Sequence, residues 1–136
     1  MRIAEHSMVI AIGVLGLIGS AFAAELTGAE IKDLISGKSV YSQSTAASST
    51  GTAGPSVIYY AADGSALCKT AGGAMWHGTW SIKDNTACVD WKEKPNNPCS
   101  KYDKQGDTIN IVNVTTGEVR AKIVKIVAGN PENLAP

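Results

Sequence analysis

The residue types that most often carry catalysis or bind metals are sparse in this chain. His77 is the only histidine after residue 6, so Ser-His-Asp chemistry would depend on it alone, and a two-histidine zinc site is excluded. Met75 precedes it by two positions, and alternate residues of a strand share a face. Adding Cys68 would give thioether, imidazole and thiolate, the ligands that Cu(I) favours. Because nothing in the spacing places Cys68 beside the other two, we expect no metal or cofactor.

Acidic residues are the next candidates, since glycoside hydrolysis needs two carboxylates that converge on one cleft. Asp63 and Asp84 lie in predicted turns, where their conformational role explains them. Asp90 lies on the predicted outer face of the sheet, and Glu93 lies in a loop. The sequence therefore predicts no catalytic residue. An enzyme that acts on envelope glycans through Asp90 or Glu93 is the alternative.

Three cysteines, Cys68, Cys88 and Cys99, give one disulfide and one leftover thiol in an oxidising compartment. If Trp91 pairs with Asn96 across the intervening loop, Cys88 lies directly opposite Cys99, where a disulfide can form. Closing this loop would stabilise the fold by roughly 3 kcal/mol. We expect Cys68 to be a buried apolar residue; an intermolecular disulfide or a metal thiolate is the alternative.

Aromatic side chains offer a second type of binding site, a platform on which sugar rings stack. The strand register places all three tryptophans in the core instead. Tyr60 is the better candidate for an exposed ring than a tryptophan. The candidate ligand-binding residues are Tyr60, His77 and Asp90.

The N-terminal segment predicts the compartment. Arg2, the uncharged apolar run from Met8 to Ile18 and the small residues of Ala21-Phe22-Ala23 are typical of a secretory signal peptide cut after Ala23. A retained membrane anchor is the alternative, but the apolar run is short for a span of about 20 residues. We expect residues 1–23 to be removed and residues 24–136 to form a single domain, periplasmic or secreted.

Charge excludes one class of partner. The chain carries 12 basic and 12 acidic residues, and no basic run is present. An electrostatic footprint for nucleic acid is therefore absent. The expected partner is an envelope ligand, a polysaccharide or a protein.

One short helix and a low-complexity segment open the domain. The spacing of Thr27 and Glu30 is that of a capping box, and Gly37 can end the helix in a left-handed conformation, which predicts a helix over Thr27–Ser36. Residues 42–54 are mainly Ser, Thr, Ala and Gly without apolar periodicity. We expect a flexible loop or a poorly ordered edge there, and a solvated spacer rather than a binding loop.

Strands separated by turn signals make up the rest. A two-residue turn at Asp84-Asn85 sets Gly78 opposite Trp91, and the glycine leaves room for the indole. Two-residue turns at Asp63-Gly64 and Gln105-Gly106 set Cys68 opposite Tyr59 and Tyr102 opposite Ile109. A three-residue loop at Thr115–Gly117 sets Ile111 opposite Ala121 and Ile109 opposite Ile123, with Gly117 in a bulged loop.

These registers gather the apolar residues on one face of the sheet. That face carries Trp76, Trp80, Ile82, Val89, Trp91, Tyr102, Ile109, Ile111 and Ile123. The other face carries Met75, His77, Thr79, Ser81, Asp90 and Lys101. We predict a mainly β fold: an antiparallel meander that curls into a small, partly closed barrel, with the short N-terminal helix packed at an opening. A flat sheet covered by the helix is second.

The chain resembles the small secreted proteobacterial proteins of the family known as domain of unknown function 995. The segments that carry the resemblance are Tyr59-Tyr60-Ala61-Ala62-Asp63-Gly64, Gly78-Thr79-Trp80-Ser81-Ile82, Cys88-Val89-Asp90-Trp91 and Cys99. The resemblance implies a location in the bacterial envelope or outside the cell, a β-rich fold and a Cys88–Cys99 bridge, and it brings no catalytic residues. The expected function is that of a non-enzymatic accessory or binding protein, with a link to the envelope or to exopolysaccharide. A copper-handling protein that uses Met75 and His77 is a further alternative.

Overall fold

A computed structural model describes residues 24–136, so the predicted signal peptide lies outside the described residues. Within residues 24–136, no helix is both long enough and apolar enough to cross a bilayer. The elements in chain order are β1 (Ala24–Glu25), α2 (Gly28–Ile35), β2 (Lys38–Ser44), β3 (Gly54–Tyr60), β4 (Ser65–Lys69), β5 (Met75–Lys83), β6 (Thr86–Trp91), β7 (Ser100–Gln105), β8 (Thr108–Asn113) and β9 (Val119–Ala128).

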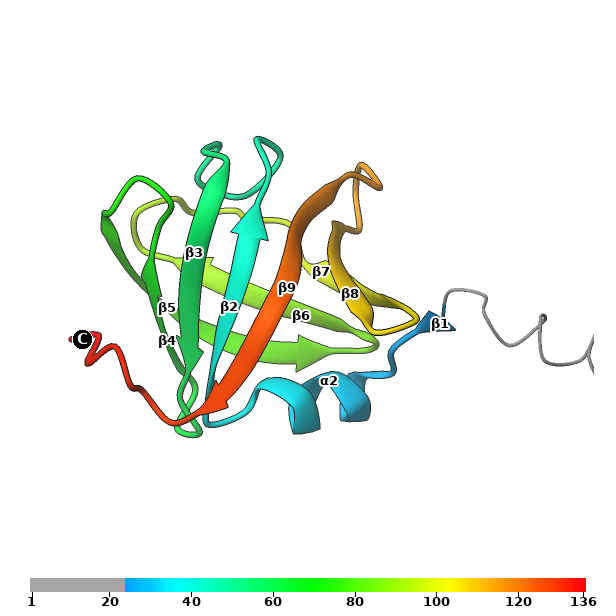
Figure 1. The fold of residues 1–136 in the computed structure, drawn as a ribbon, viewed down its shortest axis with the longest axis horizontal. Coiled ribbons are helices and arrows are strands. Elements are labelled where there is room, and N and C mark those ends of the chain that lie inside the picture. Colours follow the sequence, from blue (N-terminus) through cyan, green and yellow to red (C-terminus); the bar gives the residue numbers. More distant parts are fainter. Residues whose placement is uncertain (1–23) are drawn as a thin grey trace, which may run out of the picture.

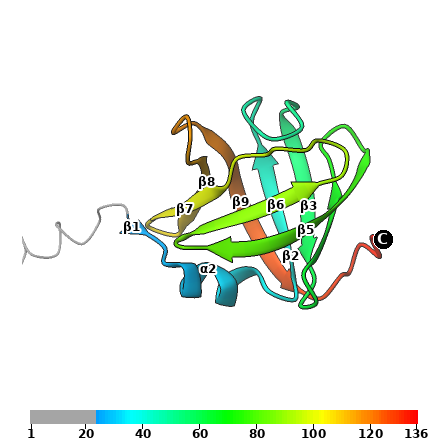
Figure 2. The same ribbon diagram turned by 180° about the vertical axis from the view of Figure 1, so that it is seen from behind.

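Strands β2 to β9 form a closed eight-stranded antiparallel barrel (Figures 1 and 2). Each strand pairs with the next along the chain, and β9 pairs back to β2, which closes the barrel. The predicted barrel is confirmed, and its closure is complete rather than partial. β6 and β7 share a single register pair, Ala87 with Ser100. The short β1 pairs with β7 further along, at Asp103 and Lys104.

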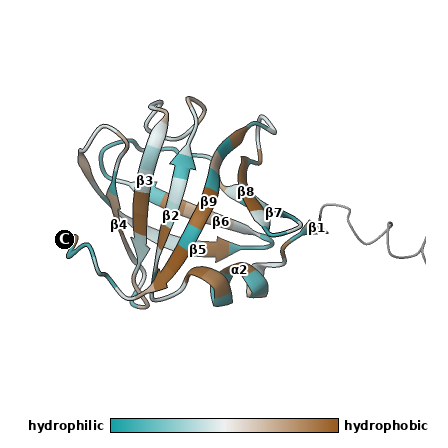
Figure 3. Cartoon of the chain, in the orientation of Figure 1, coloured by the Kyte–Doolittle hydropathy of each residue, from teal (hydrophilic) through white to brown (hydrophobic). Residues whose placement is uncertain are grey.

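Helix α2 lies across one end of the barrel, as predicted (Figure 1). Its capping box is present: the Glu30 backbone N–H donates to Thr27 Oγ1, and the Thr27 N–H donates to the Glu30 carboxylate. Gly37 follows the helix with a φ of 72°. Ile31 and Ile35 are fully buried against the barrel, so the helix covers the interior at this end. Figure 3 shows hydrophobic stretches on α2 and β9.

The hairpin at Asp84-Asn85 has the predicted register, with Gly78 opposite Trp91. Asp84 takes the positive φ that this tight turn requires, 56°. A Cβ atom at Gly78 would lie 2.3 Å from the Asp90 carbonyl oxygen and 3.0 Å from a ring carbon of Trp91. Glycine is therefore required here by the close approach of β6.

Two other predicted registers are wrong. At the β3–β4 turn, Cys68 lies opposite Ile58 rather than Tyr59, because Ala62–Gly64 form a three-residue loop in which Gly64 has a φ of 99°. This slip of one residue exchanges the two faces of β3. At the β7–β8 turn, Tyr102 lies opposite Ile111, because the turn is at Gly106-Asp107. That slip of two residues keeps each side chain on its predicted face.

The β8–β9 hairpin combines the predicted register with an unpredicted bulge. Ile111 lies opposite Ala121, as predicted, and Gly117 has a φ of 78°. The loop nevertheless spans residues 114–117, since the Asn113 N–H donates to the Glu118 carbonyl. A register shift then compensates at Arg120, which stands between paired positions on β9. The bulge leaves two consecutive residues, Arg120 and Ala121, buried.

The predicted apolar face is the barrel interior, since all nine of its side chains belong to two interior clusters. A separate apolar cluster lies on the outside of the barrel. It is centred on Val57, Leu67 and Leu134, with Tyr41, Tyr59 and Met75 packed against it. Leu134 comes from the C-terminal segment, whose Glu132 accepts a hydrogen bond from the Tyr41 hydroxyl. That segment therefore covers part of the outer face.

Candidate functional site

The interior of the barrel holds a partly open cavity of about 100 Å³. Its lining includes residues 48–50 of the segment between β2 and β3, which lies at the end of the barrel opposite α2 (Figure 1). One part of its wall is apolar and is formed by Ile58, Tyr60, Trp76, Val89, Trp91 and Ile111. The other part is lined by hydroxyl groups, those of Ser44, Ser48, Ser49, Thr50, Ser56 and Ser100. Eight strands give a barrel whose interior is either filled by side chains or holds one small ligand. Here the filling is incomplete.

Aromatic rings, those of Tyr60, Trp76, Trp91 and Tyr102, form part of the wall, and Trp80 packs behind Tyr60. Trp76 and Trp91 meet edge to face, with ring centroids 6.0 Å apart and planes at 67°. Tyr60 meets Trp80 in the same way at 5.7 Å, and the Trp80 indole N–H donates to the Ala61 carbonyl over 2.8 Å. The sugar-platform alternative for the tryptophans is not supported, because their rings belong to the interior. The prediction that Tyr60 is exposed is wrong, because the β3 slip turns it inward.

Arg120 supplies the charge of this site. The β9 bulge turns its side chain inward, and only 7% of the residue is exposed. Its Nη1 donates to the Pro98 carbonyl over 2.9 Å and to Ser100 Oγ over 3.0 Å, and its Nη2 donates to Ser49 Oγ. All three partners are neutral. Burial lowers the pKa of Arg120 below its usual value, yet a guanidinium stays protonated in proteins.

No acidic group of residues 24–136 forms an ion pair with this guanidinium. Among residues 24–136, Arg120 is the only charged side chain in the cavity wall. Burial raises the pKa of Tyr102 to about 12 and the pKa of Cys68 to about 12, and it raises the pKa of Tyr60 well above its usual value. These three groups are therefore neutral near pH 7, and the cavity carries a net positive charge.

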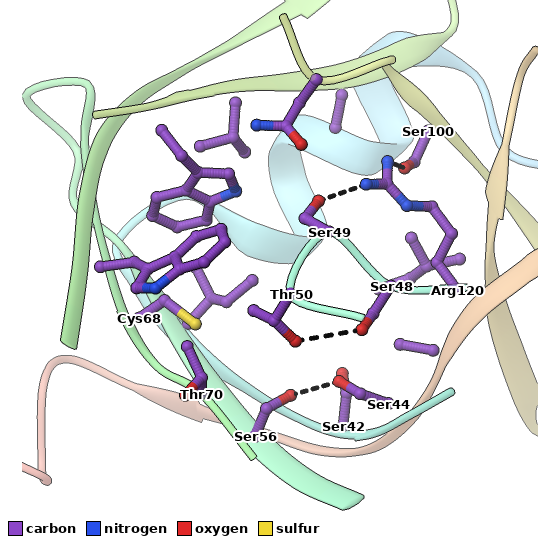
Figure 4. Close-up of a pocket in the computed structure, with 18 of the residues that line it drawn as sticks. Ser42, Ser44, Ser48, Ser49, Thr50, Ser56, Cys68, Thr70, Ser100 and Arg120 are labelled. Carbon is purple, nitrogen blue, oxygen red and sulfur yellow. Dashed lines mark hydrogen bonds between the residues drawn. The ribbon is translucent and has the colours of Figure 1, made fainter. Parts of the chain in front are cut away.

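The segment between β2 and β3 contributes part of the cavity wall (Figure 4). Ser48 and Thr50 share a hydrogen bond of 3.2 Å, and Ser44 and Ser56 share one of 2.8 Å below them. Ser49 is held twice, by Arg120 from inside and by Lys94, whose Nζ donates to the Ser49 carbonyl over 2.7 Å. Ser42–Ser44 of the predicted spacer belong to β2, and Ser48, Ser49 and Thr50 of the remaining loop line the cavity.

Two of the three predicted ligand-binding residues lie away from the cavity. His77 stands on the outer face, where its Nδ1 lies 2.9 Å from Glu93 Oε2 and its backbone N–H donates to Glu93 Oε1 over 2.8 Å. Burial raises the pKa of Glu93, but the hydrogen bonds from His77 outweigh this effect. The pKa of Glu93 therefore lies below its usual value. Asp90 is exposed, opposite Thr79. Tyr60 alone lines the cavity.

The soft-metal site does not assemble. Cys68 pairs with Trp76 on the inner face, whereas Met75 and His77 pair with Lys69 and Leu67 on the outer face. Strand geometry therefore separates the thiol from the other two ligands by the thickness of the sheet. Within the described part of the chain, no three residues of the types His, Cys, Asp and Glu cluster closely enough to hold a metal ion.

The disulfide joins Cys88 and Cys99, as predicted, with their Cα atoms 4.3 Å apart. The predicted pairing of Trp91 with Asn96 is wrong, since Trp91 forms its bridge with Lys94. The bond nevertheless sits one residue from the Ala87–Ser100 pair, where β6 and β7 meet. It therefore anchors the start of β7 and, with it, the neighbouring Pro98 carbonyl that accepts from Arg120.

Cys68 should be inert in the folded protein, because the thiolate is the reactive form. The ordinary pKa of 9.0 rises to about 12 with burial, so the thiolate fraction at pH 8 falls about 1,000-fold. We expect an aromatic disulfide reagent to label Cys68 only after urea unfolding. Labelling of the native protein at the rate of a free thiol would contradict the buried position. A Cys68→Ala variant gives the background.

Sequence reasoning missed the central residue of this site. Arg120 is the sole arginine after residue 2, whereas the chain places lysine at all ten other basic positions beyond that residue. Arginine is preferred over lysine where a buried cation must form several hydrogen bonds through its planar guanidinium. The one arginine among these lysines was therefore a usable signal. The bulge that turns it inward left no mark in the strand alternation. No family model, curated protein or solved structure matches this chain.

Proposed function

We propose that this protein is a non-enzymatic binding protein that holds one small, largely apolar molecule inside its barrel. The observation that carries the proposal is the cavity of about 100 Å³ between an aromatic wall and a ring of hydroxyls. Ligand sites are typically concave and mostly apolar, with a few polar groups that fix orientation. A cavity of this size inside the barrel favours a small molecule over a polysaccharide chain or a protein partner.

The placement of the titratable groups supports binding rather than catalysis. The titratable side chains of His77 and Asp90 lie on the outer face, and that of Glu93 lies in the adjoining loop. None of the three lines the cavity. The cavity wall offers an arginine, hydroxyls, an amide and a thiol whose pKa is about 12. A general base at neutral pH needs a pKa near 7, and these groups do not provide one.

The location we propose is the periplasm or the cell exterior. The predicted signal peptide supports it, and so does the disulfide, because such bonds persist in oxidising compartments. The resemblance to domain of unknown function 995 supports the same location and an envelope-related role. Binding of a small envelope molecule is consistent with each of these features.

The test is a titration with single-ring compounds: benzyl alcohol, benzamide, indole, benzoate and phenylacetate. Calorimetry measures the affinity and stoichiometry of all five compounds. For the four compounds other than indole, quenching of tryptophan fluorescence also reports entry, because Trp76 and Trp91 line the cavity. We expect at least one compound to bind once per protein. Saturation by none of the five would overturn the proposal.

A cavity-filling variant localises the binding. Ala87 lines the cavity and is 6% exposed, so Ala87→Leu adds three carbon atoms to the enclosed space. We expect about a tenfold or greater loss of affinity, because the ligand and the new side chain compete for one volume. Ala128→Leu adds the same atoms on an exposed position of β9 and should leave affinity unchanged. Equal affinities for the two folded variants would place the ligand elsewhere.

A further inference from the structure

The positive charge of Arg120 is buried without an anion beside it. Its three hydrogen-bond acceptors are two hydroxyls and a carbonyl, and the described residues of the cavity wall include no carboxylate. A buried charge is costly unless an opposite charge and hydrogen bonds compensate it. The fold nevertheless turns this side chain inward through a bulge, although an exposed position on β9 would cost less.

The guanidinium of Arg120 also has N–H groups that its hydrogen bonds to the described residues do not use. It has five N–H groups, and its bonds to residues 24–136 use two on Nη1 and one on Nη2. The Nε–H and the second Nη2–H therefore have no acceptor among residues 24–136. On the adjoining loop, Asn97 lines the cavity, and its buried Oδ1 has no hydrogen-bond partner. The spare donors of Arg120 thus call for an acceptor on the ligand, whereas the Asn97 oxygen calls for a donor, from another part of the ligand or from water.

We infer that the ligand is a small monocarboxylic acid whose carboxylate binds Arg120 and whose ring-sized apolar body lies against Trp76 and Trp91. The inference rests on the proposed function, which leaves the charge of the ligand open. One guanidinium with two N–H groups to spare matches the single charge and two oxygens of a carboxylate. A phosphate monoester brings nearly two charges and three acceptor oxygens, and the cavity has no second cation for them.

Lys94 extends the same electrostatic pattern to the outside. It is exposed and donates to the carbonyl of Ser49, whose hydroxyl accepts from Arg120. Both cations therefore donate hydrogen bonds to the same loop residue, Ser49. Lys94 does so from outside the barrel and Arg120 from within the cavity. An approaching anion is attracted to this side of the barrel, but the exposed ammonium is screened by solvent and salt, and the buried guanidinium is not. Recognition should consequently depend on Arg120.

The experiment compares matched acids and neutral analogues in the wild-type protein and three variants. Benzoate and benzamide have nearly the same shape and differ in charge, so the ratio of their dissociation constants isolates the carboxylate. We expect wild-type protein to prefer benzoate by about 10- to 100-fold, as for hydrogen bonds to a charged partner. Arg120→Gln should reduce the ratio to about 1, and Arg120→Lys, which keeps the charge without the fork, should give an intermediate ratio. Lys94→Gln removes the same charge at the exposed position and should keep the ratio within about threefold of wild type.

Each outcome separates this inference from the proposed function. Equal binding of benzoate and benzamide by wild type, or an unchanged ratio in Arg120→Gln, would overturn the carboxylate site and leave small-molecule binding standing. Tighter binding of phenyl phosphate than of benzoate would also overturn it. Failure of every ring compound to bind would remove the proposed function and this inference together. The wild-type ratio needs no variant, and the Lys variant locates the preference if the Gln variant does not fold.

Discussion

Replacing Cys88 and Cys99 together by alanine is expected to lower the free energy of unfolding by about 3 kcal/mol, the value that the chain-entropy model gives for a loop of this size. The bond spans 11 positions and sits where β6 and β7 share only the Ala87–Ser100 pair. Backbone pairing is therefore weakest where the covalent link is placed. Urea unfolding at pH 7, followed by circular dichroism, measures the loss.

The control for this prediction is Cys68→Ala, which removes a buried sulfur without removing a crosslink. Its free energy of unfolding should fall by less than that of the double variant, and the pairing of β6 with β7 should be kept. Hydrogen exchange should accelerate in β7 of the double variant and not in Cys68→Ala, because local opening follows the loss of the link. If the free energy of unfolding of the double variant lay within about 1 kcal/mol of that of the wild type, the junction of β6 and β7 would not need the disulfide.

Gly78→Ala is expected to destabilise the fold by about 3 kcal/mol or more, the upper range for overpacking a tight contact. The added Cβ would lie 2.3 Å from the Asp90 carbonyl oxygen, and a backbone atom cannot move aside as a flexible side chain can. β5 and β6 would have to separate beside Trp91, which also lines the cavity. Thermal and urea unfolding measure the effect.

Gly72→Ala is the matched control, because the nearest atom to its added Cβ is the Thr70 hydroxyl oxygen at 3.9 Å. A surface change of this kind stays within about 0.5 kcal/mol of wild type. If the two variants unfolded at the same urea concentration, the close approach of β6 to Gly78 would be contradicted.

Much of the scaffold could be predicted because local signals and periodicity agree there. The alternation along β5 and β6, together with the room that Gly78 leaves for Trp91, allows only one register for that hairpin. The capping box of Thr27 and Glu30 is a local exchange of hydrogen bonds that needs no tertiary information. The Cys88–Cys99 bond follows from the same strand geometry even though the loop beyond it pairs differently.

The site was less predictable because it depends on deviations of one residue. Asp63-Gly64 suits a two-residue turn and also the end of a three-residue loop, and only the second turns Tyr60 inward. Arg120 points inward because a bulge interrupts the alternation of β9, and alternation is the basis of the sequence argument. The Ser-rich loop has no periodicity, so its hydrogen bonds to Arg120 and Lys94 arise from tertiary placement alone.

The most direct test of the central claim, that the barrel holds a small molecule, is a crystal structure with the tightest-binding ring compound. We predict density for one molecule inside the barrel, with its ring against Trp76 and Trp91 and its polar group at Arg120. The compound on the outer face, with the interior occupied by water or by rearranged side chains, would contradict the claim.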